Sequence, residues 1–216
     1  EAFLLLSYHQ KIRPVTLDRV ALEVERTKVY WMDWVGRTTP FDRWSKEVRR
    51  SALVLKLLSY QETGAIMAAV TTSLPESVGE ERNWDYRFCW IRDAAMTLNM
   101  LTHLGHLNVA ENFFAYVLRV VPYKDDEIQV MYGIRGNKTL TERTLDWLAG
   151  YKHSRPVRVG NAAYTQRQHD IYGVLLNAIL RYLEVFKIDE PTGERLWTIT
   201  RSLERIVMRT WRLPDV

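Results

Sequence analysis

The sequence has almost no cysteine: Cys89 is the single one among 216 residues. One cysteine cannot form an internal disulfide, and it excludes the zinc sites that are built from several cysteines. The five histidines show no spacing typical of metal ligands, and no cofactor motif occurs, so we expect neither a metal nor an organic cofactor. A chain without disulfides is compatible with a reducing compartment, and we expect a cytoplasmic protein.

Long apolar runs and concentrated positive charge are also missing. The longest apolar runs, at residues 3–6 and 52–58, are far shorter than the roughly 20 residues of a membrane-spanning helix. The net charge is +4, but the 30 lysines and arginines are spread among 26 aspartates and glutamates. A nucleic-acid-binding protein gathers its positive charge in a patch. We therefore expect no nucleic acid and no membrane as partners, and no pattern indicates an oligomeric state.

The chain does contain helical periodicity, and its 47% of hydrophobic residues are enough for a core. The second half of the helix predicted after Phe41 is apolar on nearly all sides and should be buried. Asn108 is suited to cap a helix, and Gly105 to end the one before it. One predicted helix begins at Thr16. The others span about residues 41–60, 93–104, 108–121, 165–186 and 193–211.

Two long segments, residues 62–92 and 123–163, lack any periodicity. Loops of this length are uncommon in compact domains and are usually functional. Long and short connections alternate, so the helices should form hairpins whose long loops build a pocket at one end. An acidic cluster at residues 125–127 is expected to be solvated.

Both ends of the chain have the pattern of interrupted elements. Residues 3–8 are typical of a β-strand without its partner strands, and residues 211–216 of a transition from helix to loop. We interpret the chain as a fragment of a longer protein.

The stretch RNWDYRFCWIRD, residues 82–93, places an aromatic residue at every second position. In an extended backbone this period sends the aromatic side chains to one side and most polar ones to the other. A sugar ring has an apolar face that suits an aromatic ring and a rim of hydroxyls that suits arginine and aspartate. The pattern therefore indicates a carbohydrate site, with one face of a buried strand as the alternative.

Two acidic positions have two interpretations each. Asp93 is either the N-cap of a helix or a carboxylate held at the floor of a pocket by the helix dipole, and the two roles are compatible. Glu142 and Asp146 lie four residues apart and would share a face if the segment were helical. Nothing in the sequence marks them as an acid and base pair rather than as surface charge.

Several motifs occur in the order and with the spacing of one family. At TTSLPES, RNWDYRFCWIRDAAMTL, WLAGY, SRPVRVGNAA and QHDIYG, the chain resembles family 15 of the glycoside hydrolases. The resemblance covers about residues 30–216. It is closest to the bacterial members, which are glucoamylase-like glucan 1,4-alpha-glucosidases or alpha,alpha-trehalases.

The resemblance implies an all-α fold, an (α/α)6 barrel or six-hairpin toroid, preceded by an N-terminal β-sandwich. Residues 1–14 would then be the tail of that sandwich, with its last strand, and residues 15–40 a linker helix. Residues 41–216 would be the N-terminal part of the catalytic barrel, which the end of the chain truncates.

The resemblance also implies a glucose pocket. The family holds its terminal glucose against residues aligned with Tyr86, Trp90, Arg92 and Asp93, the aromatic residues as walls and the charged ones as partners of the outer hydroxyls. Further residues that line or brace the pocket by similarity are Arg158, Asn161, Gln168 and Asp170. Arg155 and Arg158 are candidates for a second sugar subsite or for salt-bridged scaffold.

The implied reaction is inversion at the anomeric carbon by two glutamates, a general acid and a general base roughly 6.5–9.5 Å apart. Both are expected after Val216, so the isolated chain should be inactive. The substrate would be a disaccharide or oligosaccharide, and α-glucan ends and trehalose are not separated by the sequence. The alternatives are a non-catalytic carbohydrate-binding or structural six-hairpin protein and a helical scaffold for protein interactions.

Overall fold

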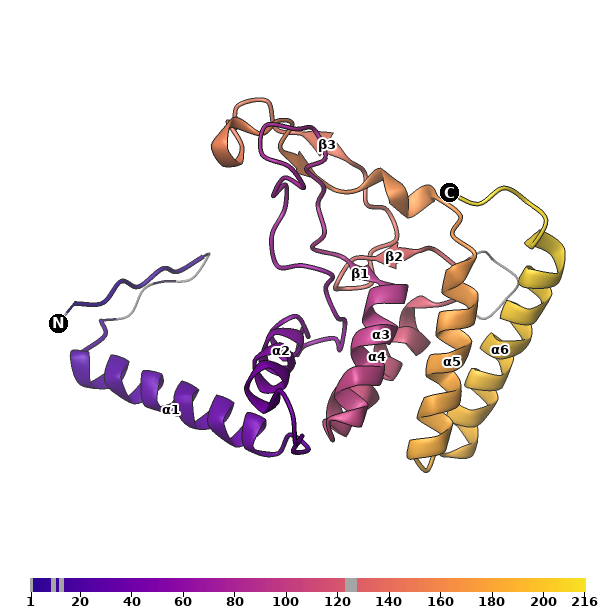
Figure 1. Ribbon diagram of the computed structural model, residues 1–216, viewed down its shortest axis with the longest axis horizontal. Coiled ribbons are helices and arrows are strands. Elements are labelled where there is room, and N and C mark those ends of the chain that lie inside the picture. The colour runs from indigo at the N-terminus through magenta and orange to yellow at the C-terminus, as the bar shows by residue number, and fades with distance from the viewer. Residues whose placement is uncertain (1, 9–10, 12–13, 123–127) are drawn as a thin grey trace. The chain divides into compact units, whose positions relative to one another are not determined.

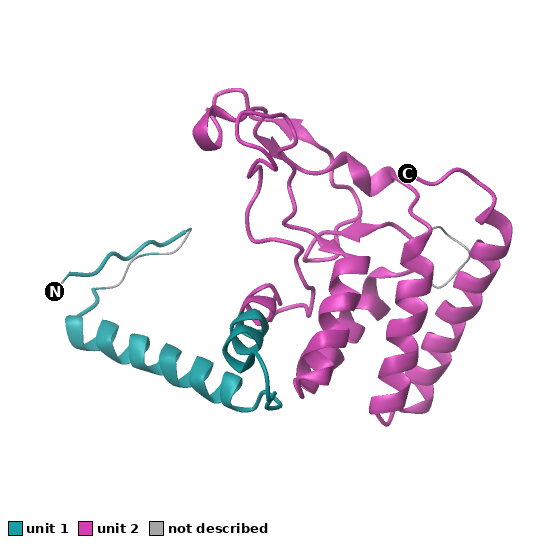
Figure 2. Ribbon diagram, viewed as in Figure 1, with its two compact units in different colours: residues 1–53 teal, residues 54–216 magenta. Residues whose placement is uncertain are grey.

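The computed structural model describes residues 2–8, 11, 14–122 and 128–216. The chain divides into two compact units, residues 1–53 and residues 54–216 (Figure 2). The acidic cluster predicted at residues 125–127 lies outside the described residues. Within the described ranges, no helix is both long and apolar enough to cross a membrane.

The first unit carries α1, Leu17–Gly36. Thr16 has an extended backbone, and its hydroxyl accepts a 3.3 Å hydrogen bond from the backbone N–H of Arg19. The predicted helix start is thereby confirmed. The strand predicted at residues 3–8 is not confirmed, since residues 2–8 form no strand. A strand needs a hydrogen-bonded neighbour, and no strand of the described part of the chain pairs with this segment.

The second helix, α2, spans Ser45–Leu57 and begins later than predicted. Trp44 has a φ of 59°, a left-handed conformation that an α-helix does not admit. The predicted burial of the second half of this helix is wrong, because Val54 and Leu57 are 49% and 58% exposed. Its apolar side chains point to several sides, and among the residues of the helix only Ala52 is buried.

The second unit is mostly helical, as predicted. Its helices are α3, Ile91–His103; α4, Leu107–Val120; α5, Asp170–Val185; and α6, Glu190–Thr210. Helix α3 packs against both α4 and α5, and α6 packs against α5 (Figure 1). The fully buried side chains in these contacts include Leu101, Phe113, Leu175 and Ile199. Apolar burial on this scale is the main stabilising term of the helical part.

The residues predicted to cap α3 and α4 do not cap them. Asp93 lies in the first turn of α3, whose N-cap is Trp90, so Asp93 does not cap the helix. The helix starts directly where strand β1 ends, before Asp93 is reached. Asn108 lies inside α4, which begins after His106.

Helix α5 begins later than predicted, because residues 162–165 form a separate 3₁₀ helix, η2, Ala162–Thr165. Helix α6 begins earlier than predicted. Asp189 caps it by accepting a 3.2 Å hydrogen bond from the backbone N–H of Thr192, and Pro191 occupies its first turn. The predicted end of α3 is confirmed, since Gly105 follows it with a φ of +87°.

In their described residues the two long loops are largely irregular, as predicted, and contain short strands and 3₁₀ helices. Strand β1, Cys89–Trp90, pairs antiparallel with β2, Met131–Tyr132. Strand β3, Arg143–Thr144, pairs antiparallel with β4, Arg158–Val159, and a 3₁₀ helix, η1, Tyr151–His153, lies between them in sequence. The N-termini of α3 and α5 both face these loops (Figure 1). The loops therefore gather at one end of the helices, where a pocket was predicted.

Candidate active site

The aromatic stretch runs alongside residues 68–76. Backbone N–H groups of Ala68, Ala69 and Ser73 donate to the carbonyls of Phe88, Tyr86 and Trp84. Within this stretch, only Cys89 and Trp90 form a regular strand, β1. The segment is thus held extended by another loop rather than by a large sheet.

Three of the four aromatic side chains lie together. Trp84, Tyr86 and Trp90 line one pocket of about 390 Å³, with the Tyr86 and Trp90 ring centroids 6.4 Å apart. Phe88 departs from the predicted alternation and lines a separate open groove beside Arg87. The polar side chains that complete the pocket wall are Glu142, Asn161 and Gln166.

A buried aspartate fixes the backbone under these rings. Asp85 is 1% exposed, and its carboxylate accepts hydrogen bonds from Arg87 Nε at 2.9 Å and Arg87 Nη2 at 2.8 Å. It also accepts one from the Gly160 N–H at 3.0 Å, and its own carbonyl accepts one from Asn161 Nδ2 at 3.0 Å. Gly160 has a φ of +78°, and a Cβ there would lie 2.0 Å from the carbonyl oxygen of Thr141. Asp85 therefore ties the aromatic segment to the loop after β4.

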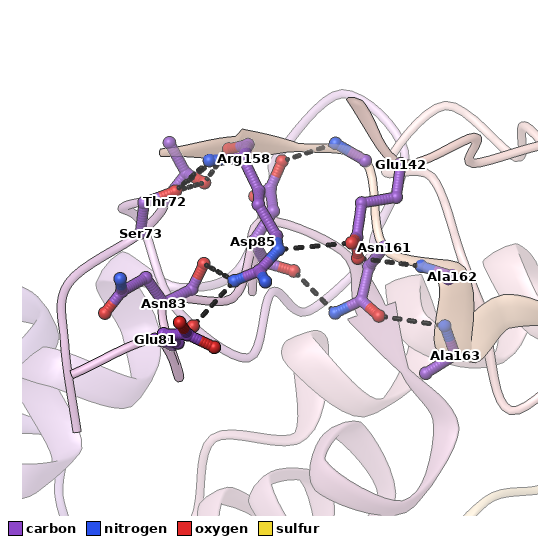
Figure 3. A network of polar contacts seen from close by, with 11 residues as sticks. Thr72, Ser73, Glu81, Asn83, Asp85, Glu142, Arg158, Asn161, Ala162 and Ala163 are labelled. Atoms are coloured by element: carbon purple, nitrogen blue, oxygen red, sulfur yellow. Dashed lines mark hydrogen bonds and ion pairs between the residues drawn. The ribbon is translucent and has the colours of Figure 1, made fainter. Parts of the chain in front are cut away.

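Arg158 forms a second connection between the same loops (Figure 3). Its guanidinium stacks 4.4 Å from the Trp84 ring and donates from Nη1 to the carbonyl oxygens of Glu81 and Asn83. Its backbone N–H donates to the Ser73 hydroxyl at 2.7 Å. The side chain is only 14% exposed and does not line the pocket. Arg158 thus braces the pocket from behind.

Glu142 lies at the other end of these contacts, just before β3. Its Oε1 is 3.2 Å from Arg158 Nε, and its Oε2 accepts a 3.2 Å hydrogen bond from the Ala162 N–H (Figure 3). The shared helix face considered for Glu142 and Asp146 does not exist, because the segment is strand and turn. Each carboxylate oxygen keeps a lone pair, and the side chain is 23% exposed at the pocket wall.

The remaining predicted residues meet where α3 and α5 begin. Arg92 Nη1 donates to Asp170 Oδ2 at 2.9 Å and to Gln168 Oε1 at 3.1 Å, and the guanidinium lies 5.9 Å from the Trp90 ring. Asp93 lies 3.8 Å from Arg92 Nε with its side chain 47% exposed. Gln168 donates in turn to Gln166 of the pocket wall at 3.1 Å. This charged cluster is therefore connected to the pocket.

The eight predicted site residues consequently fall into three groups. Tyr86, Trp90 and Asn161 line the pocket, and Arg158 braces it. The group at the two helix starts consists of Arg92, Asp93, Gln168 and Asp170. The sequence interpretation omitted Asp85 and left Glu142 without a role. Their signal was weak, because charged residues are mostly exposed and a single acid in a loop does not reveal its partners.

Two pKa shifts accompany this arrangement. Burial, together with the carboxylates of Glu76 and Asp93, raises the pKa of Tyr86, so its hydroxyl stays protonated and can donate a hydrogen bond. The hydrogen bond to Asp170 raises the pKa of Arg92, which keeps its positive charge. In the part of the chain that the structure describes, no group of three or more His, Cys, Asp or Glu side chains is placed to hold a metal ion. The pocket therefore offers aromatic faces, amides, a carboxylate and a nearby arginine, a set that suits a polyhydroxylated ring.

The chain is similar to known proteins over most of its length. Residues 43–216 match the family described as Glycosyl hydrolases family 15. A protein named trehalase from Mycobacterium tuberculosis is 42% identical over 219 residues, which cover 100% of this chain and 32% of that protein. A trehalase from Thermoplasma acidophilum is 37% identical over 98% of this chain and 35% of its own length.

A third relative, Trehalase 1 of Sulfolobus acidocaldarius, is 38% identical over 86% of this chain and 32% of that protein. The chain thus spans about a third of the length of the curated relatives it matches. No solved structure gives a significant match to the chain.

Proposed function

The chain belongs to family 15 of the glycosyl hydrolases, and from this membership we propose that the protein that contains it hydrolyses the α-glucosidic bond of trehalose. The relatives named trehalase favour trehalose over α-glucan ends. The observation that carries the proposal is the pocket in which Trp84, Tyr86 and Trp90 face Glu142, Asn161 and Gln166.

The proposed roles follow from the positions of the side chains. Tyr86 and Trp90 provide the faces against which the terminal glucose packs. Asp93, exposed beside Arg92, accepts hydrogen bonds from the outer hydroxyls of that ring. Arg92 is fixed through Nη1 beside the Trp90 ring, and on this proposal its remaining N–H groups donate to the same sugar ring.

The proposed reaction is inverting. A general acid protonates the leaving oxygen while a general base activates water on the opposite face of the sugar, and both are glutamates expected after Val216 by family resemblance. The residues of this chain bind and orient the glucose, and on this proposal the isolated chain turns over no substrate. Each missing proton transfer contributes roughly 10²–10⁴-fold to the rate.

The proposed architecture follows the same family. Helices α3 and α5 begin at the pocket and contact each other, which suits neighbouring inner helices of an (α/α)6 barrel, with α4 and α6 in its outer layer. A β-sandwich that precedes the barrel is part of the proposal.

Proton NMR of the full-length protein with trehalose and with maltotriose tests the proposed function. In the first minutes, inversion of trehalose should release β-glucose together with an equal amount of α-glucose, whereas maltotriose should react much more slowly. Faster release from maltotriose would assign a glucan substrate instead. If neither sugar is cleaved, the pocket is a binding site or a core face, and the proposed enzyme activity is wrong.

A further inference from the structure

Trp90 and Trp84 are the last and the first aromatic residues of the extended segment that line the sugar pocket, and so form the two ends of its aromatic wall. Arg92 lies over the Trp90 ring, and Arg158 lies over the Trp84 ring from behind the pocket. The proposed function uses the first end, where the terminal glucose meets Arg92 and Asp93. It assigns no role to Trp84 or to Glu142, although both line the pocket.

The carboxylate of Glu142 is held in one orientation from two sides. Arg158 Nε contacts one oxygen at 3.2 Å, and the Ala162 N–H donates to the other at 3.2 Å. Two consecutive elements, β4 and η2, supply these contacts. A carboxylate that served only as surface charge would not need to be fixed at both oxygens.

Arg158 is itself immobilised. Its Nη1 donates to two backbone carbonyls, its ring contact with Trp84 covers one face, and its backbone is fixed by the Ser73 and Thr72 hydroxyls. These contacts hold the guanidinium in place behind the pocket wall. The same arginine thereby lies over the Trp84 ring and holds the Glu142 carboxylate, the second of which Figure 3 shows.

We propose that Glu142 determines specificity by accepting a hydrogen bond from a hydroxyl of the second sugar, whose ring packs near Trp84. Arg158 is the positioning residue that holds this carboxylate. The inference rests on the proposed function, because the second sugar is located by the terminal glucose at the other end of the pocket. The free lone pairs of Glu142 and its exposure at the pocket wall make the contact possible.

The test compares two substrates of the full-length protein that share the terminal glucose. Trehalose has a second sugar with hydroxyls, whereas 4-nitrophenyl α-glucoside has a flat aromatic leaving group without them. Glu142→Gln should lower kcat/KM for trehalose by about 10- to 100-fold, mainly through a higher KM. The kcat/KM of this variant for the aryl glucoside should stay within about twofold of that of the unmodified protein, because the leaving group makes no such contact.

Matched variants separate specificity from folding. Asp146→Asn removes a carboxylate from the same exposed loop and should leave both substrates unchanged. Arg158→Lys should reproduce the selective loss on trehalose, because lysine cannot contact Glu142, two carbonyls and the Trp84 ring together. Glu142→Ala would also remove the carboxylate, but it could lower the melting temperature because it shortens the side chain. Glu142→Gln keeps the size of the side chain, so specificity is judged from this variant.

If Glu142→Gln lost kcat/KM equally on both substrates with an unchanged melting temperature, the inference would be overturned. An unchanged KM of this variant for trehalose would also overturn it. These outcomes leave the proposed function intact, because the unmodified protein is active in both. If the unmodified protein hydrolyses neither substrate, the proposed function fails and the inference fails with it.

Discussion

The helices and the loops of the second unit are held together by different interactions. Helices α3 to α6 meet through apolar side chains such as Leu101, Phe113 and Leu175. The loops around the pocket meet through Asp85 and Arg158, whose hydrogen bonds join segments more than 70 residues apart in sequence. Apolar packing is tolerant of small shifts, whereas hydrogen bonds to a buried charge demand particular directions.

This difference separates stability from pocket shape. A change in the helices should alter how stable the protein is and leave the pocket as it was. A change at Asp85 or Arg158 should alter where Trp84, Tyr86 and Glu142 point. The following predictions test that separation.

Phe113→Ala should have the largest effect on stability. Phe113 is fully buried and stacks with Tyr116 at 6.4 Å, and removing a ring from such a core costs about 3–5 kcal/mol. Thermal melting should show a drop of roughly 10 °C, at about 2–4 °C per kcal/mol for a unit of this size. In the full-length protein, at a temperature where the variant is folded, the KM for trehalose should be unchanged. A changed KM would mean that the helical core and the pocket are not independent.

Asp85→Asn should reduce stability by about 2–3 kcal/mol and also disturb the pocket. The amide loses the charge that pairs with Arg87 and one acceptor for the N–H groups that reach it, and burial leaves no water to replace them. The expected results are a lower melting temperature and a higher KM for trehalose. Asp146→Asn, on the surface of a neighbouring loop, serves as the control and should change stability by less than about 0.5 kcal/mol. A KM equal to that of the unmodified protein would show that Asp85 does not fix the pocket.

Asp93→Asn should leave stability nearly unchanged and weaken glucose binding. The side chain is 47% exposed, and its carboxylate lies 3.8 Å from Arg92 Nε. Loss of its charge-assisted hydrogen bonds should lower kcat/KM by about 100-fold, which corresponds to about 2.7 kcal/mol. Calorimetric titration with glucose checks binding, and melting checks the fold. Unchanged glucose binding would favour the scaffold interpretation over a sugar site.

Alkaline pH should destabilise the part of the second unit that surrounds β1 and β2. Burial raises the pKa of the Cys89 thiol from 9.0 to about 12 and that of Tyr132 from 10.0 to about 12. The unfolded chain releases these protons first, so this stability is fully present below about pH 9 and is lost as pH rises toward 12. The free energy of unfolding should fall by about 1–2 kcal/mol between pH 8 and pH 10.

Denaturant unfolding at both pH values measures this change, and Cys89→Ala should make it smaller. If the free energy of unfolding of Cys89→Ala changed with pH as much as that of the unmodified protein, Cys89 would not titrate in this range.

Sequence reasoning predicted the helices better than the residues that shape the site. Apolar spacing located α3 to α6, because a helix that buries one face must repeat its apolar residues. The start of α3 was wrong because β1 ends at Trp90, and strand pairing between residues far apart leaves no local pattern. Asp85 and Glu142 were not recognised for the same reason, since their partners, Gly160, Arg158 and Ala162, lie in another loop.

A crystal structure of the full-length protein with a sulfur-linked analogue of trehalose, which resists hydrolysis, would show directly where both sugar rings bind. We expect one glucose ring against Tyr86 and Trp90, with its hydroxyls toward Arg92 and Asp93, and the second ring beside Trp84 and Glu142. A sugar bound elsewhere, with this pocket empty, would contradict this expectation.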